Sequence, residues 1–262
     1  MSFNKLLKNH CIFKNNRLCL GLDVDNRNLK NTSLDYMGKY IEDIIDATIE
    51  ICPVYKFNFA FYERHGSKGF FLLENLQSYI GNKAITIADA KRGDIGNSSK
   101  YYAEAIFEQF NFDSVTVTPY MGKDSIKPFV EFDKDKGVFI LALTSNEGSS
   151  DFQKQLIKDS ALYKLVVELS NKMNVKNNVG IVVGATNEEH LIDIDKVSRN
   201  LPWLMPGIGF QGGNLKKSIL TGEKNYLSLI NVSRGILQFK NGTIDNIREA
   251  VENYTSEIRK IL

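Results

Sequence analysis

Three charged residues follow one apolar stretch and are the clearest candidates for chemistry. Residues 84–88 (AITIA) are followed by Asp89, Lys91 and Asp94, so two carboxylates flank one ammonium within six residues. Alternate side chains of a strand point to the same face, so Asp89 and Lys91 should project together. Carboxylates on either side of a lysine keep it charged and hold it in place. The spacing therefore predicts a catalytic charge array.

The alternative for such a short motif is a solvent-exposed ion pair at the end of a strand. A strand as apolar as residues 84–88 is expected to be covered on both faces. The carboxyl ends of such strands are where α/β folds keep their chemistry. Gly93 and Gly96 flank Asp94 and allow the chain to leave the strand in a turn. These features favour the catalytic array.

Two further charges precede the array. Residues 17–25 form an apolar run with Asp23 near its carboxyl end, and Lys56 lies among the aromatic residues of 54–61. A lysine in such a strand usually has a carboxylate partner, and Asp23 is the obvious candidate. The alternative is a lysine at a strand edge whose ammonium reaches solvent.

The last two expected strands end in a pattern typical of anion binding. A glycine-rich segment at 206–213 is followed, one strand later, by Ser233 and Arg234. Glycines let backbone N–H groups approach an anion, and an arginine adds a bidentate charge. Such turns are also common as plain loops, but phosphate in a (β/α)₈ barrel is usually bound after strands seven and eight. The position therefore predicts a phosphate site.

Strands and helices alternate along the chain. The expected strands are residues 17–25, 54–61, 84–88, 114–120, 137–144, 179–186, 203–209 and 227–232. Helices are expected at 1–16, between Ser33 and Pro53, and at 68–80, 98–110 (core positions Tyr101, Ala105, Ile106 and Phe110), 163–173, 188–199 and 244–262. This order predicts an α/β fold of the (β/α)₈ TIM-barrel class: a single catalytic domain over 1–262, with 1–16 as a lead-in helix. A doubly wound open sheet is the alternative, but no glycine fingerprint follows the first strand.

Composition excludes several classes of function. The chain has 262 residues, 43% of them hydrophobic, and a net charge of +2, so neither nucleic acid nor a membrane surface is expected as a partner. We find no signal peptide and no apolar run long enough to span a bilayer. Cys11, Cys19 and Cys52 form no paired framework and no metal-ligand spacing, which favours reduced thiols in the cytoplasm. The three histidines are scattered, so catalysis is expected to use Lys and Asp.

Together these motifs resemble the orotidine 5′-phosphate decarboxylase family, in its bacterial-type subgroup. The matching segments, in family order, are residues 22–23 (LD), 55–58 (YKFN), 89–96 (DAKRGDIG), 117–122 (VTPYMG), 144–146 (TSN), 183–186 (VGAT), 206–209 (PGIG), 211–213 (QGG) and 233–235 (SRG). The D-x-K-x-x-D-I core is the most specific of them. The family implies a (β/α)₈ homodimer with shared active sites, no metal and no organic cofactor.

The resemblance implies a role for each candidate residue. Lys91 is similar to the residue that protonates C6 of the pyrimidine, and Asp89 and Asp94 to its flanking carboxylates, with Asp94 supplied by the other subunit. Lys56 resembles the lysine that completes the array, and Asp23 the carboxylate that binds this lysine and a ribose hydroxyl. Ser98 resembles the residue that reaches the ribose in the partner's site, and Ser145 the residue that contacts the edge of the base. Gln211 resembles the side chain that bridges phosphate and base, and Ser233 with Arg234 the residues that bind the phosphate. Two positions depart from the family pattern: Glu147 stands where many members have proline, and Phe210 is bulkier than usual.

The implied reaction is decarboxylation of orotidine 5′-phosphate to UMP and CO₂, the last step of UMP biosynthesis. Loss of CO₂ leaves a carbanion at C6 with no adjacent electron sink, and an ammonium aimed at C6 would stabilise it and then protonate it. One alternative is a Mg²⁺-dependent sugar-phosphate decarboxylase or aldolase on the same barrel, whose carboxylates bind the metal. Another is a catalytically silent nucleotide-binding module, which an intact array of four charges argues against.

Overall fold

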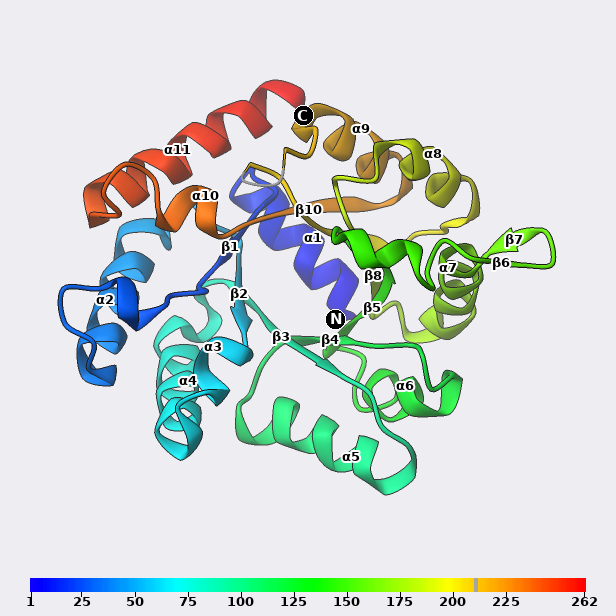
Figure 1. The fold of residues 1–262 in the computed structure, drawn as a ribbon, viewed down its shortest axis with the longest axis horizontal. Helices are drawn as coiled ribbons and strands as arrows, with labels where there is room; N and C mark the ends of the chain where they lie inside the picture. The colour runs from blue at the N-terminus through cyan, green and yellow to red at the C-terminus, as the bar shows by residue number, and fades with distance from the viewer. Residues whose placement is uncertain (210–211) are drawn as a thin grey trace.

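In the described part of the chain, eight parallel strands close into a barrel. The computed structural model describes residues 1–209 and 212–262, and Figure 1 shows helices surrounding the strands. The barrel strands are β1 (Leu18–Gly21), β2 (Val54–Asn58), β3 (Ile85–Arg92), β4 (Ser114–Val117), β5 (Gly137–Leu143), β8 (Val179–Val183), β9 (Pro202–Pro206) and β10 (Leu227–Val232). They follow one another around the barrel in chain order, and β10 pairs with β1 to close it. The expected single-domain (β/α)₈ TIM barrel is confirmed.

The helices cover the outer face of the barrel. They are α2 (Leu34–Thr48), α3 (Ala60–Glu63), α4 (Gly66–Ile80), α5 (Gly96–Glu104), α6 (Lys123–Val130), α7 (Leu162–Met173), α8 (Glu188–Val197), α9 (Leu215–Asn225), α10 (Arg234–Leu237) and α11 (Ile244–Ile261). A small antiparallel hairpin, β6 (Leu156–Ile157) and β7 (Ser160–Ala161), lies before α7. The sequence did not predict α6 or α9, because α6 contains a proline and α9 is rich in lysine and polar residues.

The expected start of α2 is confirmed by its capping contact. The Ser33 hydroxyl accepts a hydrogen bond from the backbone N–H of Tyr36 at 3.2 Å, which satisfies one of the donors left free at a helix start. Ile41, Ile44 and Ile45 are then buried at helical spacing. The helix therefore packs on the barrel through the apolar face that its sequence indicated.

Two expected strands have different ends in the structure. The strand expected at 54–61 stops at Asn58, because Phe59 already has helical backbone angles and caps α3. The strand that begins with the apolar run 84–88 was expected to carry Asp89 and Lys91, and it does so, because β3 extends to Arg92. It can do so because its pairing with β4 shifts register between Ala88 and Arg92.

The helix expected at 98–110 begins at Gly96 and changes at Ala105–Gln109 into a π-helical turn. Tyr101 was expected in the core, but it is 64% exposed. Ile106 is buried as expected, and Ala103 and Phe107 are buried with it. A π-turn changes the residues per turn, so a regular helical period extended through residues 98–110 assigns the wrong face.

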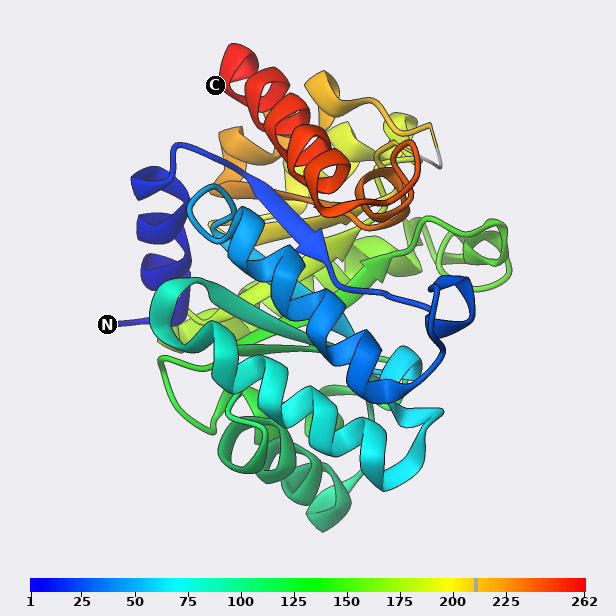
Figure 2. The same ribbon diagram turned by 90° about the vertical axis from the view of Figure 1, so that its left-hand side faces the viewer.

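A helix closes the end of the barrel at which the strands begin. Figure 2 shows α1 (Phe3–Phe13) at that end, beside the N-terminus. Phe3, Leu7 and Cys11 are fully buried. They pack against inward-facing residues of the strands: Cys19, Val54, Ile85, Ile87, Phe139, Val182, Leu204, Leu227 and Leu229. The opposite end, where the strands finish, carries the candidate site. Within the described residues, no helix is long and apolar enough to cross a membrane.

Candidate active site

A cavity of about 620 Å³ opens at the carboxyl ends of the barrel strands. Seven of the predicted site residues line it: Asp23, Lys56, Asp89, Lys91, Ser145, Ser233 and Arg234. They follow or end strands β1, β2, β3, β5 and β10, so the barrel brings together side chains that lie up to about two hundred positions apart.

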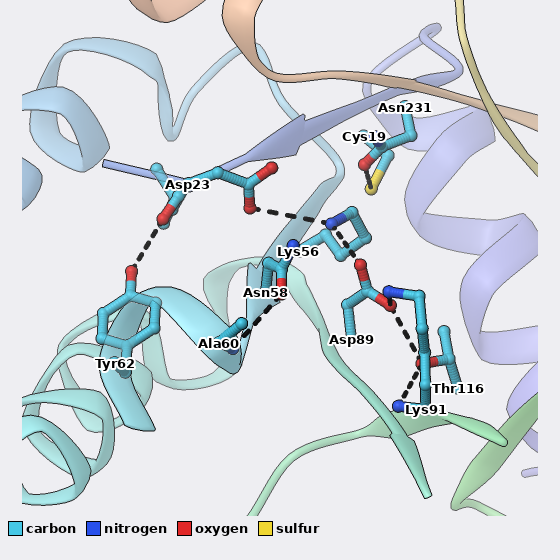
Figure 3. A network of polar contacts seen from close by, with 11 residues as sticks. Cys19, Asp23, Lys56, Asn58, Ala60, Tyr62, Asp89, Lys91, Thr116 and Asn231 are labelled. Carbon is cyan, nitrogen blue, oxygen red and sulfur yellow. Dashed lines mark hydrogen bonds and ion pairs between the residues drawn. The ribbon is translucent and has the colours of Figure 1, made fainter. Parts of the chain in front are cut away.

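Four of these side chains form a row of alternating charge. Lys91 Nζ donates to Asp89 Oδ1 at 2.6 Å, and Lys56 Nζ donates to Asp89 Oδ2 at 2.8 Å. Lys56 Nζ also lies 3.7 Å from Asp23 Oδ1 (Figure 3). Asp23 was the expected partner of Lys56, and it is a neighbour, but the hydrogen-bonded partner is Asp89. One carboxylate therefore holds both lysines.

Burial and charge fix the protonation state of the inner part of this row. The side chains of Lys56 and Asp89 are only 5% and 11% exposed. Burial would raise the pKa of Asp89, but the charges and hydrogen bonds of Lys56 and Lys91 outweigh it and hold that pKa well below its usual range. Burial would likewise lower the pKa of Lys56, but Asp23 and Asp89 raise it above its ordinary value. The Lys91 side chain is 49% exposed, so its ammonium is the one presented to the cavity.

A bulged backbone aims Lys91. Its φ angle is +46°, in the left-handed region that non-glycine residues rarely adopt. Its N–H donates to the hydroxyl of Thr116 at 3.0 Å, and that hydroxyl donates to Asp89 Oδ1, also at 3.0 Å (Figure 3). Asp89 and Lys91 therefore meet as predicted, but through an irregular strand rather than through simple alternation.

Two buried polar atoms at the cavity have no hydrogen-bond partner among the described residues: Asp23 Oδ1 and Ser233 Oγ. The backbone of Leu22, the residue before Asp23, is firmly held. Its N–H donates to Lys56 O at 2.9 Å, and its carbonyl accepts from Tyr62 Oη at 2.8 Å. Buried polar atoms are normally satisfied. Both atoms are therefore suited to a bound molecule that carries hydroxyl or other polar groups.

Ser145 lies in a loop after β5 that is held by two amide side chains. Gln153 accepts the N–H of Thr144 at 2.7 Å and donates to its hydroxyl at 2.8 Å. Asn187 Nδ2 donates to the Thr144 carbonyl at 2.9 Å. A Cβ on Gly184 would lie 2.7 Å from the Ser145 backbone, so only glycine permits this approach. The loop is therefore fixed against β8 with Ser145 at the cavity.

The glycine-rich turn after β9 folds back on itself beside Arg234. Gly207 has φ +106°, and its carbonyl accepts the N–H of Gly213 at 3.0 Å. A Cβ on Gly213 would lie 2.8 Å from that carbonyl, so the turn requires glycine there. Arg234 begins α10 and lines the cavity. The two remaining positions of interest in this turn, Phe210 and Gln211, lie outside the described residues.

Two predicted site residues do not line the cavity of their own chain. Asp94 is half-buried and accepts the N–H of Ile95 at 2.8 Å, and Ser98 is exposed on α5. Large apolar side chains are exposed at the start of α5, on α5 and after β4: Ile95, Tyr101, Tyr102, Tyr120 and Met121. The single chain therefore leaves Asp94 and Ser98 outside the row of charges.

Among the polar residues that line the cavity, Asn58, Thr116 and Asn231 received no role from the sequence. Asn231 Oδ1 accepts a weak hydrogen bond from Cys19 Sγ at 3.6 Å, and Asn58 Oδ1 accepts from Ala60 N at 3.3 Å. Each is a polar residue within or at the end of a buried strand, and that was the signal available in the sequence. In the described chain, no group of three or more His, Cys, Asp or Glu side chains is placed to hold a metal ion together.

Comparison with known proteins agrees with this geometry. Residues 16–244 match the model of the orotidine 5′-phosphate decarboxylase / HUMPS family. The chain is 41% identical to an orotidine 5′-phosphate decarboxylase of Dehalococcoides mccartyi over 97% of its length and 98% of that protein's. It is 42% identical to one from Flavobacterium johnsoniae, over 95% and 94% of the two chains. The structure of Leishmania donovani OMP decarboxylase superposes with a TM-score of 0.86 at 34% identity, over 100% of this chain and 99% of the other. The chain therefore belongs to the orotidine 5′-phosphate decarboxylase / HUMPS family.

Proposed function

We propose that this chain decarboxylates orotidine 5′-phosphate to UMP and CO₂, the last step of UMP biosynthesis. The observation that carries the proposal is the row Asp23, Lys56, Asp89 and Lys91 at the cavity, which ends in one half-exposed ammonium. Relatives at 41% and 42% identity that cover nearly the whole chain are named for this activity. The Mg²⁺-dependent alternative on the same barrel is not favoured by these relatives.

The charge row suits the bond changes of the reaction. When the bond between C6 and the substrate carboxylate breaks, CO₂ leaves and the electron pair stays on C6. The Lys91 ammonium stabilises that developing charge, then gives its proton to C6 and regains one from solvent. Asp89 holds the ammonium at 2.6 Å, so its position is set before substrate arrives. Preorganised electrostatics is the main source of the rate enhancement.

Repulsion between carboxylates is a second contribution. A protein carboxylate about 4 Å from that of the substrate would add roughly 4 kcal/mol at an effective dielectric near 20. Asp89 is the candidate in this chain, because the lowered pKa keeps it ionised. Release of CO₂ relieves this repulsion, but we rank it behind stabilisation of the carbanion.

The rest of the cavity is assigned to substrate binding. Arg234 and Ser233 bind the 5′-phosphate, with Gln211 between phosphate and base. Ser145 contacts the base edge, and Asp23 Oδ1, which lacks a hydrogen bond among the described residues, accepts a ribose hydroxyl. Binding energy from the distant phosphate helps to offset the cost of bringing like charges together at C6.

The active site is shared in a homodimer. Asp94 and Ser98 lie outside their own cavity, and the apolar side chains exposed on α5 and after β4 offer a surface for a second copy. In a two-fold dimer, each site then combines Asp89 and Lys91 of one chain with Asp94 and Ser98 of the other.

Three buried, free cysteines fit the cytoplasm as the compartment of the enzyme.

Mixed dimers test the shared site. Lys91→Ala and Asp94→Asn are each expected to be inactive, and mixing with full subunit exchange should restore about a quarter of wild-type activity. About half of the dimers are then mixed, and one of the two sites in each is intact. If activity stays at the level of the separate mutants after exchange has been demonstrated, Asp94 acts within its own chain.

The reaction itself is tested by following the loss of orotidine 5′-phosphate absorbance with the purified protein. The proposal expects turnover that survives exhaustive treatment with EDTA, and UMP and CO₂ in equal amounts. Loss of activity with EDTA and its return with Mg²⁺ would favour the metal-dependent alternative. Absence of turnover with this substrate would overturn the proposal.

A further inference from the structure

Thr116 is a buried residue of β4 whose hydroxyl contacts both members of the catalytic pair. It is 1% exposed. Its Oγ1 accepts the backbone N–H of Lys91 and donates to Asp89 Oδ1, each at 3.0 Å. A hydroxyl has one proton to donate and lone pairs to accept with, so both bonds can exist together. Figure 3 shows Thr116 beside Asp89 and the backbone of Lys91.

The register of β3 explains why this hydroxyl is needed. Ala88 pairs with Val115 and Arg92 with Val117, so four steps along β3 correspond to two along β4. Extra residues in one strand lose their partners in the ladder. The N–H of Lys91 lies within this bulge, and a side-chain oxygen takes the place of a backbone carbonyl.

The conformation of Lys91 also needs support. A non-glycine residue at φ +46° is strained and persists only when its surroundings hold it there. Thr116 restrains the backbone at Lys91, while Asp89 restrains the ammonium at the other end of the same side chain. The hydroxyl thereby links the carboxylate to the backbone of the proton donor in one small cycle of hydrogen bonds.

We propose that Thr116 is a positioning residue for the reaction: its hydroxyl fixes the bulge so that the Lys91 ammonium is aimed at the reacting carbon. The inference rests on the proposed function. Thr116 transfers no proton to substrate, and it acts on the step in which charge develops. Its removal should therefore lower kcat much more than it weakens substrate binding.

The test replaces Thr116 by Val and by Ser. Thr116→Val keeps the branched shape but removes the hydroxyl, so the Lys91 N–H loses its acceptor and Asp89 Oδ1 keeps only its hydrogen bond from Lys91 Nζ. We expect kcat to fall about 10- to 100-fold, with KM within about threefold of wild type. Thr116→Ser keeps the hydroxyl and should recover kcat to within about threefold. Thr118→Val, two residues further along, makes the same chemical change outside the cavity and should leave kcat unchanged.

UMP affinity and the melting temperature are measured for all variants, and Thr116→Ala takes the place of Thr116→Val if the latter does not fold. A purely structural role would lower kcat only as far as it lowers the folded fraction. Wild-type kcat in folded Thr116→Val, or equal losses in the Val and Ser variants, would overturn the inference alone. If the wild-type chain itself does not turn over orotidine 5′-phosphate, the proposed function fails and the inference fails with it.

Discussion

At the end of the barrel where the strands begin, α1 seals the interior with three fully buried hydrophobic side chains, Phe3, Leu7 and Cys11. At the other end, the same strands finish at a cavity of about 620 Å³ with a row of four charges. Most of the buried side chains of α1 are hydrophobic and recur at helical spacing, with Asn4 as the buried polar exception. The open end contains a register shift, a lysine at φ +46° and two buried polar atoms that have no hydrogen-bond partner among the described residues.

The difference shows how one fold divides stability from chemistry. Packing at the closed end contributes free energy of folding without any constraint from substrate. The open end keeps strain and close charges that only the surrounding barrel can hold in place. Substitutions at the closed end should therefore lower stability with little effect on turnover. Substitutions at the open end should lower turnover with little effect on stability.

The largest effect is expected from Lys91→Ala at the open end. It removes the proposed proton donor and the charge proposed to stabilise the carbanion, two contributions of about 10²–10⁴-fold and 10²–10³-fold in rate. We expect kcat to fall by at least about 10⁴-fold, with UMP binding and melting temperature near wild type. Lys5→Ala, which changes an exposed lysine of α1, is the matched control and should leave kcat unchanged. Turnover within tenfold of wild type in Lys91→Ala would contradict the conclusion that the open end carries the chemistry.

At the closed end, Phe3→Ala should destabilise the fold. Phe3 packs edge-on against Phe139 at 6.0 Å between ring centroids, and it fills the space beside Gly137. Removing a buried phenylalanine costs about 3–5 kcal/mol of unfolding free energy. Chemical denaturation should show this loss, while kcat/KM of the folded fraction stays within about threefold. Phe13→Ala removes an 84% exposed ring from the same helix and should cost little. A large fall in kcat/KM with unchanged stability would contradict the division.

Arg234→Ala should weaken the phosphate end of the site. Losing charge-assisted hydrogen bonds to a phosphate should lower kcat/KM about 100-fold. With the nucleoside lacking its phosphate as substrate, added phosphite dianion should accelerate wild type far more than this variant. Arg248→Ala, on the outer face of α11, removes an arginine that is about half exposed and serves as the control. Equal activation of wild type and Arg234→Ala by phosphite would show that Arg234 does not bind the phosphate.

The smallest effect expected is on the acid stability of the open end. The pKa of Asp89 is lowered in the folded state, so the unfolded chain binds more protons as the pH falls. The stabilisation that Asp89 contributes is therefore present above its unfolded pKa of about 4 and is lost as pH falls toward its folded pKa. Denaturation curves of wild type and Asp89→Asn between pH 7 and pH 3 should converge by about 1 kcal/mol. Parallel curves over this range would show that Asp89 is not held as described.

Much of this arrangement could be predicted from the sequence, because it depends on strand order and local spacing. Asp89 and Lys91 are two positions apart at the end of an apolar strand, and Arg234 follows the last strand directly. Once the barrel is recognised, both positions imply that these side chains lie at the carboxyl ends of the strands. Because β10 pairs with β1, the side chains after the last strand then lie beside those after the first.

The contacts that the sequence did not predict depend on register. Lys56 pairs in the ladder with Ile87, not with Asp89, so its bond to Asp89 follows from the twist of the barrel and the length of the lysine chain. Thr116 was missed because its contacts with Asp89 and Lys91 arise from a bulge in the neighbouring strand. Tyr101 was misplaced because the π-turn begins only four residues later. Each of these features depends on strand register or on a change of helix type, and neither can be read from the residue types nearby.

The central claim is that Lys91 protonates a carbanion at C6, and the reverse of that step can be measured directly. In D₂O, the wild-type protein should exchange the C6 hydrogen of UMP for deuterium, seen by NMR as loss of the C6–H signal while C5–H remains. Lys5→Ala should exchange at the wild-type rate, and Lys91→Ala should not exchange above the rate without protein. Exchange by Lys91→Ala at the wild-type rate would contradict the assignment of Lys91 as the proton donor.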